Sequence, residues 1–322
     1  MRAMRIHEYG GPDVLRDDDV PEPAPGAGQA LVAVEASGLN FIDVYQRTGA
    51  YPVPLPATLG LEGAGTVVGV GAGVTTVAPG DRVAWTGVPG AYAESAVVPA
   101  NRLVPLPDGV TARQGAAIML QGMTAHYLAT DTYALQPGDT CLVHAGAGGV
   151  GLLLTQIARL CGARVITTVS TPAKAALSQE AGASDVVLYT QDDVEAAVKA
   201  LTGNRGVQVV YDSVGRATFD KSLNCLAPRG MMVLFGQASG PVPPFDLQVL
   251  AARGSLFITR PTLNTYIASD ADLRRRADDL FRWVGEGTLR LRTEHEYPLA
   301  QVAEAHRALE ARQTTGKVLL IP

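Results

Sequence analysis

The chain has 322 residues, of which 47% are hydrophobic and 18% are charged, and this globular balance excludes wholesale disorder. Its formal net charge is −5, and the absence of long lysine or arginine runs argues against a whole-chain footprint for nucleic acid or anionic lipid. At roughly 150 residues per domain, two domains are expected.

The three cysteines, Cys141, Cys161 and Cys225, cannot make a disulfide framework and are too few for a four-cysteine zinc site. They favour a reducing, cytoplasmic location. The first eight residues contain no apolar signal core. The longest uncharged stretch, 140–158, is broken by four glycines, so we interpret it as a strand, a turn and a helix rather than a membrane span.

The first third of the chain is strand-like and rich in turns. Residues 30–36, 65–74 and 81–85 are rich in valine, leucine or other apolar residues and are separated by glycine and proline, as strands joined by tight turns are. No helix-period segment occurs before about residue 111. This part is therefore expected to be a mostly β domain.

The middle of the chain alternates short valine-rich runs with longer segments rich in alanine and leucine. The predicted strands are 140–145, 163–169, 186–189, 207–212 and 231–236, and the predicted helices are 150–161, 172–181, 193–202 and 218–226. Such alternation predicts parallel strands joined by crossover helices. The tail adds predicted helices at 270–285 and 299–311 and a last strand, 317–321, that we expect to rejoin the first domain.

A glycine-rich motif, Gly146-Ala-Gly148-Gly149-Val150-Gly151, fits the pattern G-x-G-x-x-G. The pattern alone is weak, but here it follows an apolar strand and opens an apolar helix. One glycine makes the tight turn, a second lets the backbone approach a pyrophosphate, and a third lets helix and strand pack closely. The helix N-terminus then offers free N–H groups and partial positive charge to a diphosphate. The motif therefore predicts a dinucleotide site.

The end of the second predicted strand indicates which dinucleotide binds. An NAD enzyme usually has an acidic residue there to bind the ribose hydroxyls. This chain has Ser170, Thr171 and Lys174 and no carboxylate, a set that suits a 2′-phosphate. Charge-assisted hydrogen bonds contribute about 1.5–3 kcal/mol each, enough to set a preference. The sequence predicts NADPH as cofactor, with a solvated helix position as the alternative for Lys174.

Several motifs resemble the zeta-crystallin-like quinone oxidoreductases of the medium-chain dehydrogenase/reductase superfamily. They are Gly38-Leu-Asn-Phe-Ile-Asp-Val-Tyr45, Gly60-Leu-Glu-Gly-Ala-Gly65, the glycine motif, Val210-Tyr-Asp-Ser-Val-Gly215 and Gly254-Ser-Leu-Phe-Ile-Thr-Arg-Pro261. The resemblance runs nearly from end to end and is closest to the bacterial NADPH:quinone reductases.

This resemblance implies a GroES-like β domain, the catalytic domain, formed by residues 1–122 and 265–322. It implies an inserted Rossmann domain that binds NADP, residues 123–264, with the active site in the cleft between the two. The resemblance also implies a homodimer.

The resemblance makes the absence of zinc ligands informative. Zinc alcohol dehydrogenases of this superfamily carry a cysteine where this chain has Asn40 and a histidine where it has Leu61. Leucine cannot donate a lone pair to zinc and asparagine is a poor zinc ligand, so no metal is expected. Without a Lewis acid, alcohol oxidation loses its main electrostatic support. Quinones and activated alkenes are already electrophilic and accept a hydride without one.

The resemblance also implies roles for individual residues. The candidate catalytic residues are Tyr45, for the substrate oxygen, and Asn40. The implied cofactor contacts beyond the glycine motif and Ser170, Thr171 and Lys174 are Phe41, Ile42, Asp43 and Val44 at the nicotinamide, Tyr127 near the diphosphate, Tyr189 and Arg312 at the 2′-phosphate, Ser213, Phe235, Gly236, Gln237 and Ala238 at strand ends, and Pro261, Thr262 and Leu263 at the carboxamide.

Other polar residues are expected to be structural. A core tyrosine is the alternative for Tyr45, and a hydrogen-bonded structural carboxylate is favoured over catalysis for Glu62. We expect His144 to be buried and hydrogen-bonded and His306 to be isolated. The run 274–276 of three arginines is expected to form a solvated helix face.

The predicted activity is hydride transfer from NADPH to a small-molecule quinone without zinc, with the proton supplied by solvent or Tyr45. One alternative is NADPH-dependent reduction of an enone or enoyl thioester. A less favoured alternative is a nucleic-acid-binding protein, against which the charge of −5 and the lack of interleaved basic and aromatic residues argue.

Overall fold

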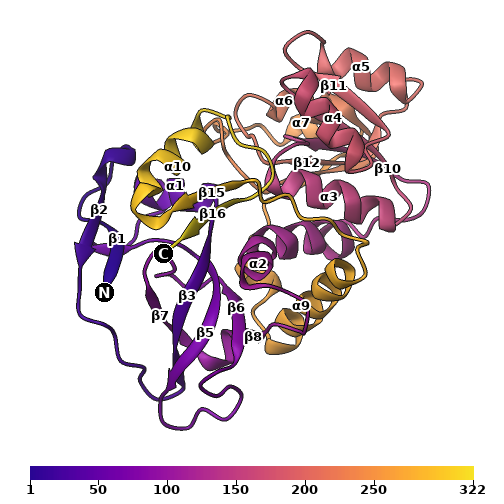
Figure 1. Ribbon diagram of the computed structural model, residues 1–322. Helices are drawn as coiled ribbons and strands as arrows, with labels where there is room; N and C mark the ends of the chain where they lie inside the picture. The colour runs from indigo at the N-terminus through magenta and orange to yellow at the C-terminus, as the bar shows by residue number, and fades with distance from the viewer. The chain divides into compact units, whose positions relative to one another are not determined.

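The computed structural model describes the whole chain, Met1–Pro322, and divides into two compact units. The terminal unit consists of Met1–Met123 and Tyr266–Pro322, and the central unit consists of Thr124–Thr265. Both ends of the chain belong to the terminal unit (Figure 1).

The central unit is built on a six-stranded parallel sheet. The strands are β9 (Thr140–His144), β10 (Arg164–Val169), β11 (Asp185–Leu188), β12 (Val207–Asp212), β13 (Leu226–Leu234) and β14 (Phe257–Thr259). They lie in the order β11-β10-β9-β12-β13-β14, and every neighbouring pair is parallel. In chain order this is 3-2-1-4-5-6, the doubly wound arrangement of dinucleotide-binding folds. The predicted alternation of strands and helices is confirmed.

Helices connect these strands. They are α3 (Gly149–Leu160), α4 (Pro172–Glu180), α5 (Val194–Leu201), α6 (Phe219–Cys225) and α7 (Gln248–Ala252), and a π-helical turn, η3 (Leu128–Thr132), precedes the sheet. The strand residues Leu142, Ile166 and Val210 are fully buried in one apolar cluster, as a sheet covered on both faces requires. The uncharged stretch 140–158 forms β9, a turn and most of α3. None of the helices in the chain has both the length and the apolar character of a membrane span.

The first third of the chain is mostly β, as predicted, and it supplies eight of the ten strands of the terminal unit. Its larger sheet has the order β15-β16-β3-β5-β6-β8 with β7 on β3, and its smaller sheet has the order β2-β1-β4. The strands are β1 (Arg2–Ile6), β2 (Leu15–Asp19), β3 (Gln29–Leu39), β4 (Ala57–Thr58), β5 (Glu62–Val70), β6 (Arg82–Thr86), β7 (Ser95–Pro99), β8 (Val104–Pro105), β15 (His295–Pro298) and β16 (Val318–Ile321).

Four longer helices and three 3₁₀ turns complete the terminal unit. They are α1 (Phe41–Arg47), α2 (Ala112–Tyr127), α9 (Asp270–Gly285) and α10 (Val302–Glu310), with η1 (Pro12–Val14), η2 (Ala100–Arg102) and η4 (Leu299–Gln301). The helix α2 begins in the terminal unit and ends in the central unit, and the short helix α8 (Leu263–Tyr266) spans the second boundary.

The last strand rejoins the first domain, as expected. β16 pairs antiparallel with β3, with Leu319 opposite Gly38 and Val318 opposite Leu39. This pairing brings Lys317, the residue before β16, to the end of β3 and to the start of α1, where its Nζ donates to Asn40 Oδ1 at 3.0 Å. Two segments almost 280 positions apart in the sequence thereby meet at one place.

Three expectations were wrong. The structure has a helix, α1, ahead of residue 111, and seven residues are too few to show a helical period. Of the arginine run, Arg276 is only 1% exposed because it shares the inward face of α9 with Leu273 and Leu280, and its Nε donates to the Tyr266 carbonyl. His306 is buried rather than isolated, and its Nδ1 accepts a hydrogen bond from Arg47 at 3.0 Å.

Candidate functional site

The carboxyl ends of the central strands gather most of the predicted cofactor residues. The glycine motif follows β9, Ser170 follows β10, Tyr189 follows β11, Ser213 follows β12 and Phe235 follows β13. Because all these strands are parallel, the segments that follow them emerge at the same edge of the sheet. That edge is where open parallel sheets bind ligands, at the point where strand order reverses between β9 and β12.

The glycine motif forms the turn between β9 and α3 with very little free space. A Cβ on Gly151 would lie 2.3 Å from the Ala145 carbonyl oxygen, and one on Gly146 would lie 2.6 Å from the Thr167 Cβ. Both glycines therefore permit close packing of backbone, helix and strand. Gly148, the N-cap of α3, has only the Ala145 carbonyl oxygen near its Cβ position, at 3.2 Å.

The first N–H groups of an α-helix have no partners within the helix, and those of α3 begin at Gly149. The helix has twelve residues, so its N-terminus carries a developed partial positive charge. A tight glycine turn ending in a free helix N-terminus fits a pyrophosphate group.

The end of β10 carries hydroxyls and a cation but no acid. Thr171 caps α4, since its Oγ1 accepts from the Lys174 backbone N–H at 3.3 Å. Thr190 Oγ1 donates to the Ser170 carbonyl oxygen at 2.9 Å, which ties the ends of β10 and β11 together. Tyr189 is 40% exposed. These positions present polar groups on the surface of the central unit.

A buried polar chain fixes the ends of β9, β10 and β12. Asp212 Oδ1 accepts from the backbone N–H groups of Val214 and Gly215, and its Oδ2 accepts from the hydroxyls of Thr218 and Ser222. Because the Ser222 hydroxyl donates to Asp212, its oxygen accepts from His144 Nε2, at 3.0 Å.

The other ring nitrogen of His144, Nδ1, then accepts from the Thr168 hydroxyl, at 2.8 Å. Burial lowers the pKa of His144 and so favours the neutral ring, in which the nitrogen that does not donate to Ser222 is an acceptor. His144 is therefore buried and hydrogen-bonded, as predicted.

The remaining predicted residues of the central unit lie in short loops. Gly236 packs so closely on Ser213 that a Cβ would lie 2.5 Å from the Ser213 carbonyl oxygen. Ala238 N–H donates to the same carbonyl at 3.1 Å, with Gln237 between them in the loop. Thr262 Oγ1 contacts Thr265 Oγ1 at 3.1 Å, with Pro261 before it and Leu263 starting α8.

Two residues predicted to contact the cofactor, Tyr127 and Arg312, do not follow a strand of the parallel sheet. Tyr127 is the last residue of α2 and is only 2% exposed. Arg312 belongs to the terminal unit, exposed and two residues beyond the end of α10.

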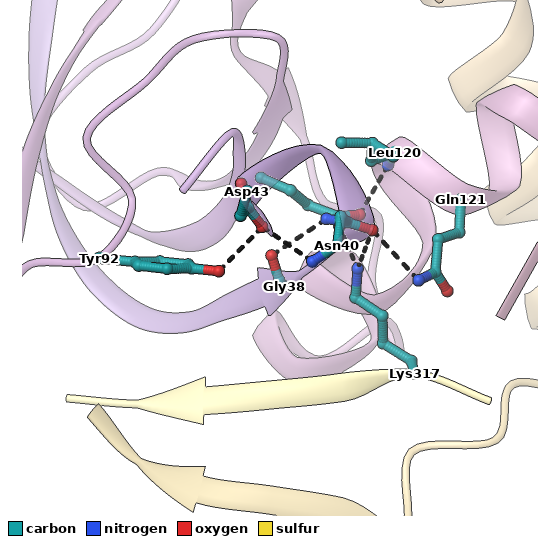
Figure 2. A network of polar contacts seen from close by, with 8 residues as sticks. Gly38, Asn40, Asp43, Tyr92, Leu120, Gln121 and Lys317 are labelled. Atoms are coloured by element: carbon teal, nitrogen blue, oxygen red, sulfur yellow. Dashed lines mark hydrogen bonds and ion pairs between the residues drawn. The ribbon is translucent and has the colours of Figure 1, made fainter. Parts of the chain in front are cut away.

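The terminal unit holds a buried polar network around Asn40 (Figure 2). Asn40 Nδ2 donates to the Gly38 carbonyl at 3.1 Å and to Glu62 Oε2 at 2.9 Å. Asn40 Oδ1 accepts from Lys317 Nζ at 3.0 Å and from Gln121 Nε2 at 3.1 Å. Every hydrogen-bonding position of the Asn40 amide is therefore used within the protein.

Glu62 is fully buried and bonded through both carboxylate oxygens. Its Oε2 forms an ion pair with Lys317, and its Oε1 accepts from the Leu120 backbone N–H at 2.6 Å. These contacts match the structural role favoured for Glu62. Sequence reasoning missed Lys317 and Gln121, because a lysine before a strand and a glutamine on a helix are exposed by default.

Asp43 lies beside this network in α1. It is fully buried, and its Oδ2 accepts from the Asn40 backbone N–H and from the Tyr92 hydroxyl, both at 2.8 Å. Its Oδ1 is buried without a hydrogen-bond partner. Burial raises the pKa of Asp43 to about 7, against the hydrogen bonds from Asn40 and Tyr92, which lower it.

The aromatic residues of α1 lie next to a third ring. The Tyr45 and Tyr51 ring centroids are 5.1 Å apart, and those of Phe41 and Tyr45 are 6.3 Å apart. Tyr45, Phe41 and Ile42 are half-buried, whereas Val44 is buried. The apolar side chain of Leu61 is 9% exposed. Nowhere in the chain do three histidine, cysteine, aspartate or glutamate side chains form a group suited to a metal ion.

Two family models match the chain. The model described as alcohol dehydrogenase GroES-like domain matches residues 26–108, and the one described as zinc-binding dehydrogenase matches residues 149–273. The expected combination of a GroES-like domain and a Rossmann-type parallel sheet is thereby confirmed.

Individual relatives extend over the whole chain. A quinone oxidoreductase of Pseudomonas aeruginosa is 47% identical, with 100% of this chain and 99% of that protein covered. A 2-haloacrylate reductase of Burkholderia is 40% identical, with 99% of this chain and 98% of that protein covered. Among solved structures, Escherichia coli quinone oxidoreductase complexed with NADPH has a TM-score of 0.98, 41% identity and full coverage of both chains.

Proposed function

The chain belongs to the quinone oxidoreductase family of the medium-chain dehydrogenase/reductase superfamily, and we infer that it reduces quinones with NADPH. The observation that carries this inference is the full-length likeness, in sequence and in fold, to the E. coli quinone oxidoreductase complexed with NADPH. The sequence-based prediction of an NADPH-dependent oxidoreductase agrees with it.

The residues of the central unit fit this cofactor. We propose that the turn of Gly146, Gly148 and Gly149 and the N-terminus of α3 hold the diphosphate, because the turn is close-packed and the first N–H groups of the helix have no helical partners. NADPH supplies the hydride when it is bound. The buried chain from Asp212 to Thr168 fixes the strand ends around this position.

We propose that the residues following β10 select a cofactor with a 2′-phosphate. The hydroxyls of Ser170 and Thr171 are able to donate hydrogen bonds to a phosphate, and Lys174 supplies positive charge. Residues 170–174 contain no carboxylate that would repel a phosphate. Tyr189 and Arg312 are proposed as further contacts to this phosphate.

On the substrate side, we propose that Tyr45 contacts the quinone oxygen. Its ring is half-buried beside Phe41 and Tyr51, so the phenol lies on an apolar surface that a flat quinone ring matches. Asn40 precedes this helix, and both of its amide protons are bound by Gly38 and Glu62. A substrate oxygen reaching Asn40 would have to share one of those protons.

We propose that the reaction proceeds without zinc. At the two positions where zinc alcohol dehydrogenases carry zinc ligands, this chain has Asn40 and Leu61. All hydrogen-bonding positions of the Asn40 amide are used by protein contacts, and the Leu61 side chain is a hydrocarbon. Neither provides the thiolate or imidazole that zinc prefers. Quinones need no metal to accept a hydride, so the proposed substrate and the donor set agree.

The test is a substrate panel. The rates at which NADPH and NADH are oxidised are measured by absorbance, with quinones, enones and aldehydes in turn as acceptors. We expect quinones with NADPH to give the highest kcat/KM. Turnover of aldehydes alone would refute the proposal.

Reduction of an activated alkene is a second candidate function. It is favoured by the relative named 2-haloacrylate reductase, which is 40% identical over nearly the full length of both proteins. The same panel separates the two candidates, because an alkene reductase turns over enones in preference to quinones.

We also propose a homodimer in the cytoplasm. β14 is the edge strand of the parallel sheet, and Phe257 at its start is 56% exposed, so the edge offers unpaired backbone groups and an apolar side chain to a second copy. The mass in solution of the parent and of Phe257→Glu tests this.

All three cysteines are free thiols, which suits a reducing compartment. No nucleic-acid partner is proposed.

A further inference from the structure

Lys317 is buried among groups that surround Asn40, and no role was predicted for it. Its side chain is 3% exposed, and its ammonium donates to Asn40 Oδ1 and pairs with the fully buried Glu62. Two buried charges are costly unless each finds a partner. Such a pair within bonding distance of Asn40, the N-cap of α1, calls for a functional explanation.

The pair fixes the orientation of the Asn40 amide. With the amide reversed, its NH₂ group would face the donors Lys317 Nζ and Gln121 Nε2, and its oxygen would face the acceptors Glu62 and the Gly38 carbonyl. All four hydrogen bonds would be lost, so only one orientation is compatible with the network.

The backbone around the pair is shaped to admit it. A Cβ on Gly38 would lie 2.3 Å from Glu62 Oε2 and 2.5 Å from Lys317 Nζ. Gly38 has no positive φ that would require glycine there. The Ala116 carbonyl oxygen would lie 2.6 Å from the same Cβ, so the ion pair and this carbonyl together take the space of a side chain.

The network also holds the start of α1. Asn40 is the N-cap of α1, and its backbone N–H donates to Asp43 Oδ2 one turn into the helix. Figure 2 shows Lys317, which precedes β16, and Gln121 of α2 reaching Asn40. The Leu120 backbone N–H, also in α2, donates to Glu62. Tyr45, the proposed substrate contact, lies on the same helix, five residues after Asn40.

We propose that Lys317 is a positioning residue for quinone reduction, which neutralises Glu62 and locks Asn40 and the start of α1. This inference rests on the proposed function. Addition of a hydride, which is a proton with two electrons, turns a quinone into a hydroquinone monoanion, and one more proton completes the hydroquinone. An uncompensated carboxylate at Glu62 would oppose the negative charge that develops on the substrate oxygen.

The main test compares Lys317→Met with the double variant Glu62→Gln/Lys317→Met. In the single variant, kcat/KM for 1,4-naphthoquinone at saturating NADPH is expected to fall about tenfold to a hundredfold at pH 8. The loss is expected to be smaller at pH 6, because an unpaired buried carboxylate takes up a proton more readily. The double variant, which has no buried charge at either position, is expected to recover most of the loss.

Two readouts separate positioning from general damage. The Kd for NADPH, measured by its fluorescence, is expected to stay within about twofold of the parent, since the proposed diphosphate site is in the other unit. Both pH comparisons are made relative to the parent at the same pH, because Asp43, which interacts with Glu62 and Lys317, has a pKa of about 7 in the parent as well. Relative to the parent, the melting temperature of the cofactor-free single variant is expected to drop more at pH 8 than at pH 6, and the double variant is expected to lose that difference. Lys199→Met, which removes the exposed partner of Glu195, is the matched control and is expected to leave both readouts unchanged.

The outcomes are distinguishable. Parental kcat/KM in Lys317→Met at both pH values, or a loss that neither pH nor Glu62→Gln alters, would overturn the proposal. If the single variant does not fold, the double variant decides: kcat/KM within about threefold of the parent supports charge compensation, and a folded but inactive double variant refutes it. A parent chain that does not oxidise NADPH with quinones refutes the proposed function instead.

Discussion

Replacing Asp43 with asparagine is expected to remove a pH dependence from the stability of the terminal unit. Asp43 is fully buried, one of its oxygens has no partner, and burial raises its pKa from 3.8 to about 7. The charged or titratable groups around it are Tyr92, Glu62 and Lys317. Tyr92 stays neutral in this range because burial raises its pKa well above 10.

The sign and the size of the effect follow from these values. Between pH 3.8 and about 7 the unfolded chain releases the Asp43 proton while the folded chain keeps it, so the free energy of unfolding falls as pH rises. The contribution is fully present below pH 3.8 and is lost by the time pH passes about 7. At 1.36 kcal/mol per pH unit, the total loss is about 4 kcal/mol.

The variant Asp43→Asn imitates the protonated carboxyl. Its amide oxygen accepts from Asn40 N–H and the Tyr92 hydroxyl, and its NH₂ group takes the position of the oxygen without a partner. The difference in unfolding free energy between parent and variant is therefore expected to change by about 4 kcal/mol between pH 4 and pH 8, in favour of the variant at high pH.

Urea unfolding followed by tryptophan fluorescence measures this difference at each pH. Trp85 and Trp283 both belong to the terminal unit, so the signal reports on the unit that holds Asp43. Asp81→Asn is the matched control, an exposed aspartate in the same unit that accepts from the Ala78 N–H. If the difference in unfolding free energy between parent and variant does not change with pH, Asp43 does not have the raised pKa that its burial implies.

Three further predictions concern the cofactor and the substrate. Gly151→Ala is expected to weaken NADPH binding at least tenfold and to destabilise the fold by about 1–3 kcal/mol, because its Cβ would lie 2.3 Å from the Ala145 carbonyl oxygen. Gly285→Ala is the control, because the added Cβ has open space there. Fluorescence titration with NADPH and urea unfolding measure the two effects. Lys174→Glu is expected to raise the Kd for NADPH by about tenfold or more and to leave that for NADH nearly unchanged, and equal tightness for NADPH would contradict the assignment. Tyr45→Phe is expected to lower kcat for quinones by about tenfold with the NADPH Kd preserved, and unchanged turnover would remove the hydroxyl from the reaction.

The central unit was predictable because its information is local. Alternating strand and helix runs, together with the glycine motif after β9, define a parallel sheet and its binding edge without any long-range contact. The structure then adds what only packing can show. The Cβ positions of Gly146 and Gly151 are closed by neighbouring backbone and side chains, whereas that of Gly148 has one close neighbour, the Ala145 carbonyl oxygen at 3.2 Å.

The network around Asn40 was not predictable from local patterns. Lys317 and Glu62 are 255 positions apart in the sequence and meet through the pairing of β16 with β3. No local sequence pattern near either residue predicts the contact. Arg276 was missed for a related reason. A run of charged residues is expected to be exposed, and only the structure shows that Arg276 lies on the buried face of α9.

The proposed function requires that a coenzyme carrying a 2′-phosphate delivers hydride to a quinone with no bound metal. The most direct measurement is the ratio of kcat/KM for NADPH to that for NADH, with a quinone acceptor, on protein shown by elemental analysis to be metal-free. We expect a ratio well above one and a rate that added zinc leaves unchanged. A rate that appears only when zinc is restored, or a preference for NADH, would contradict it.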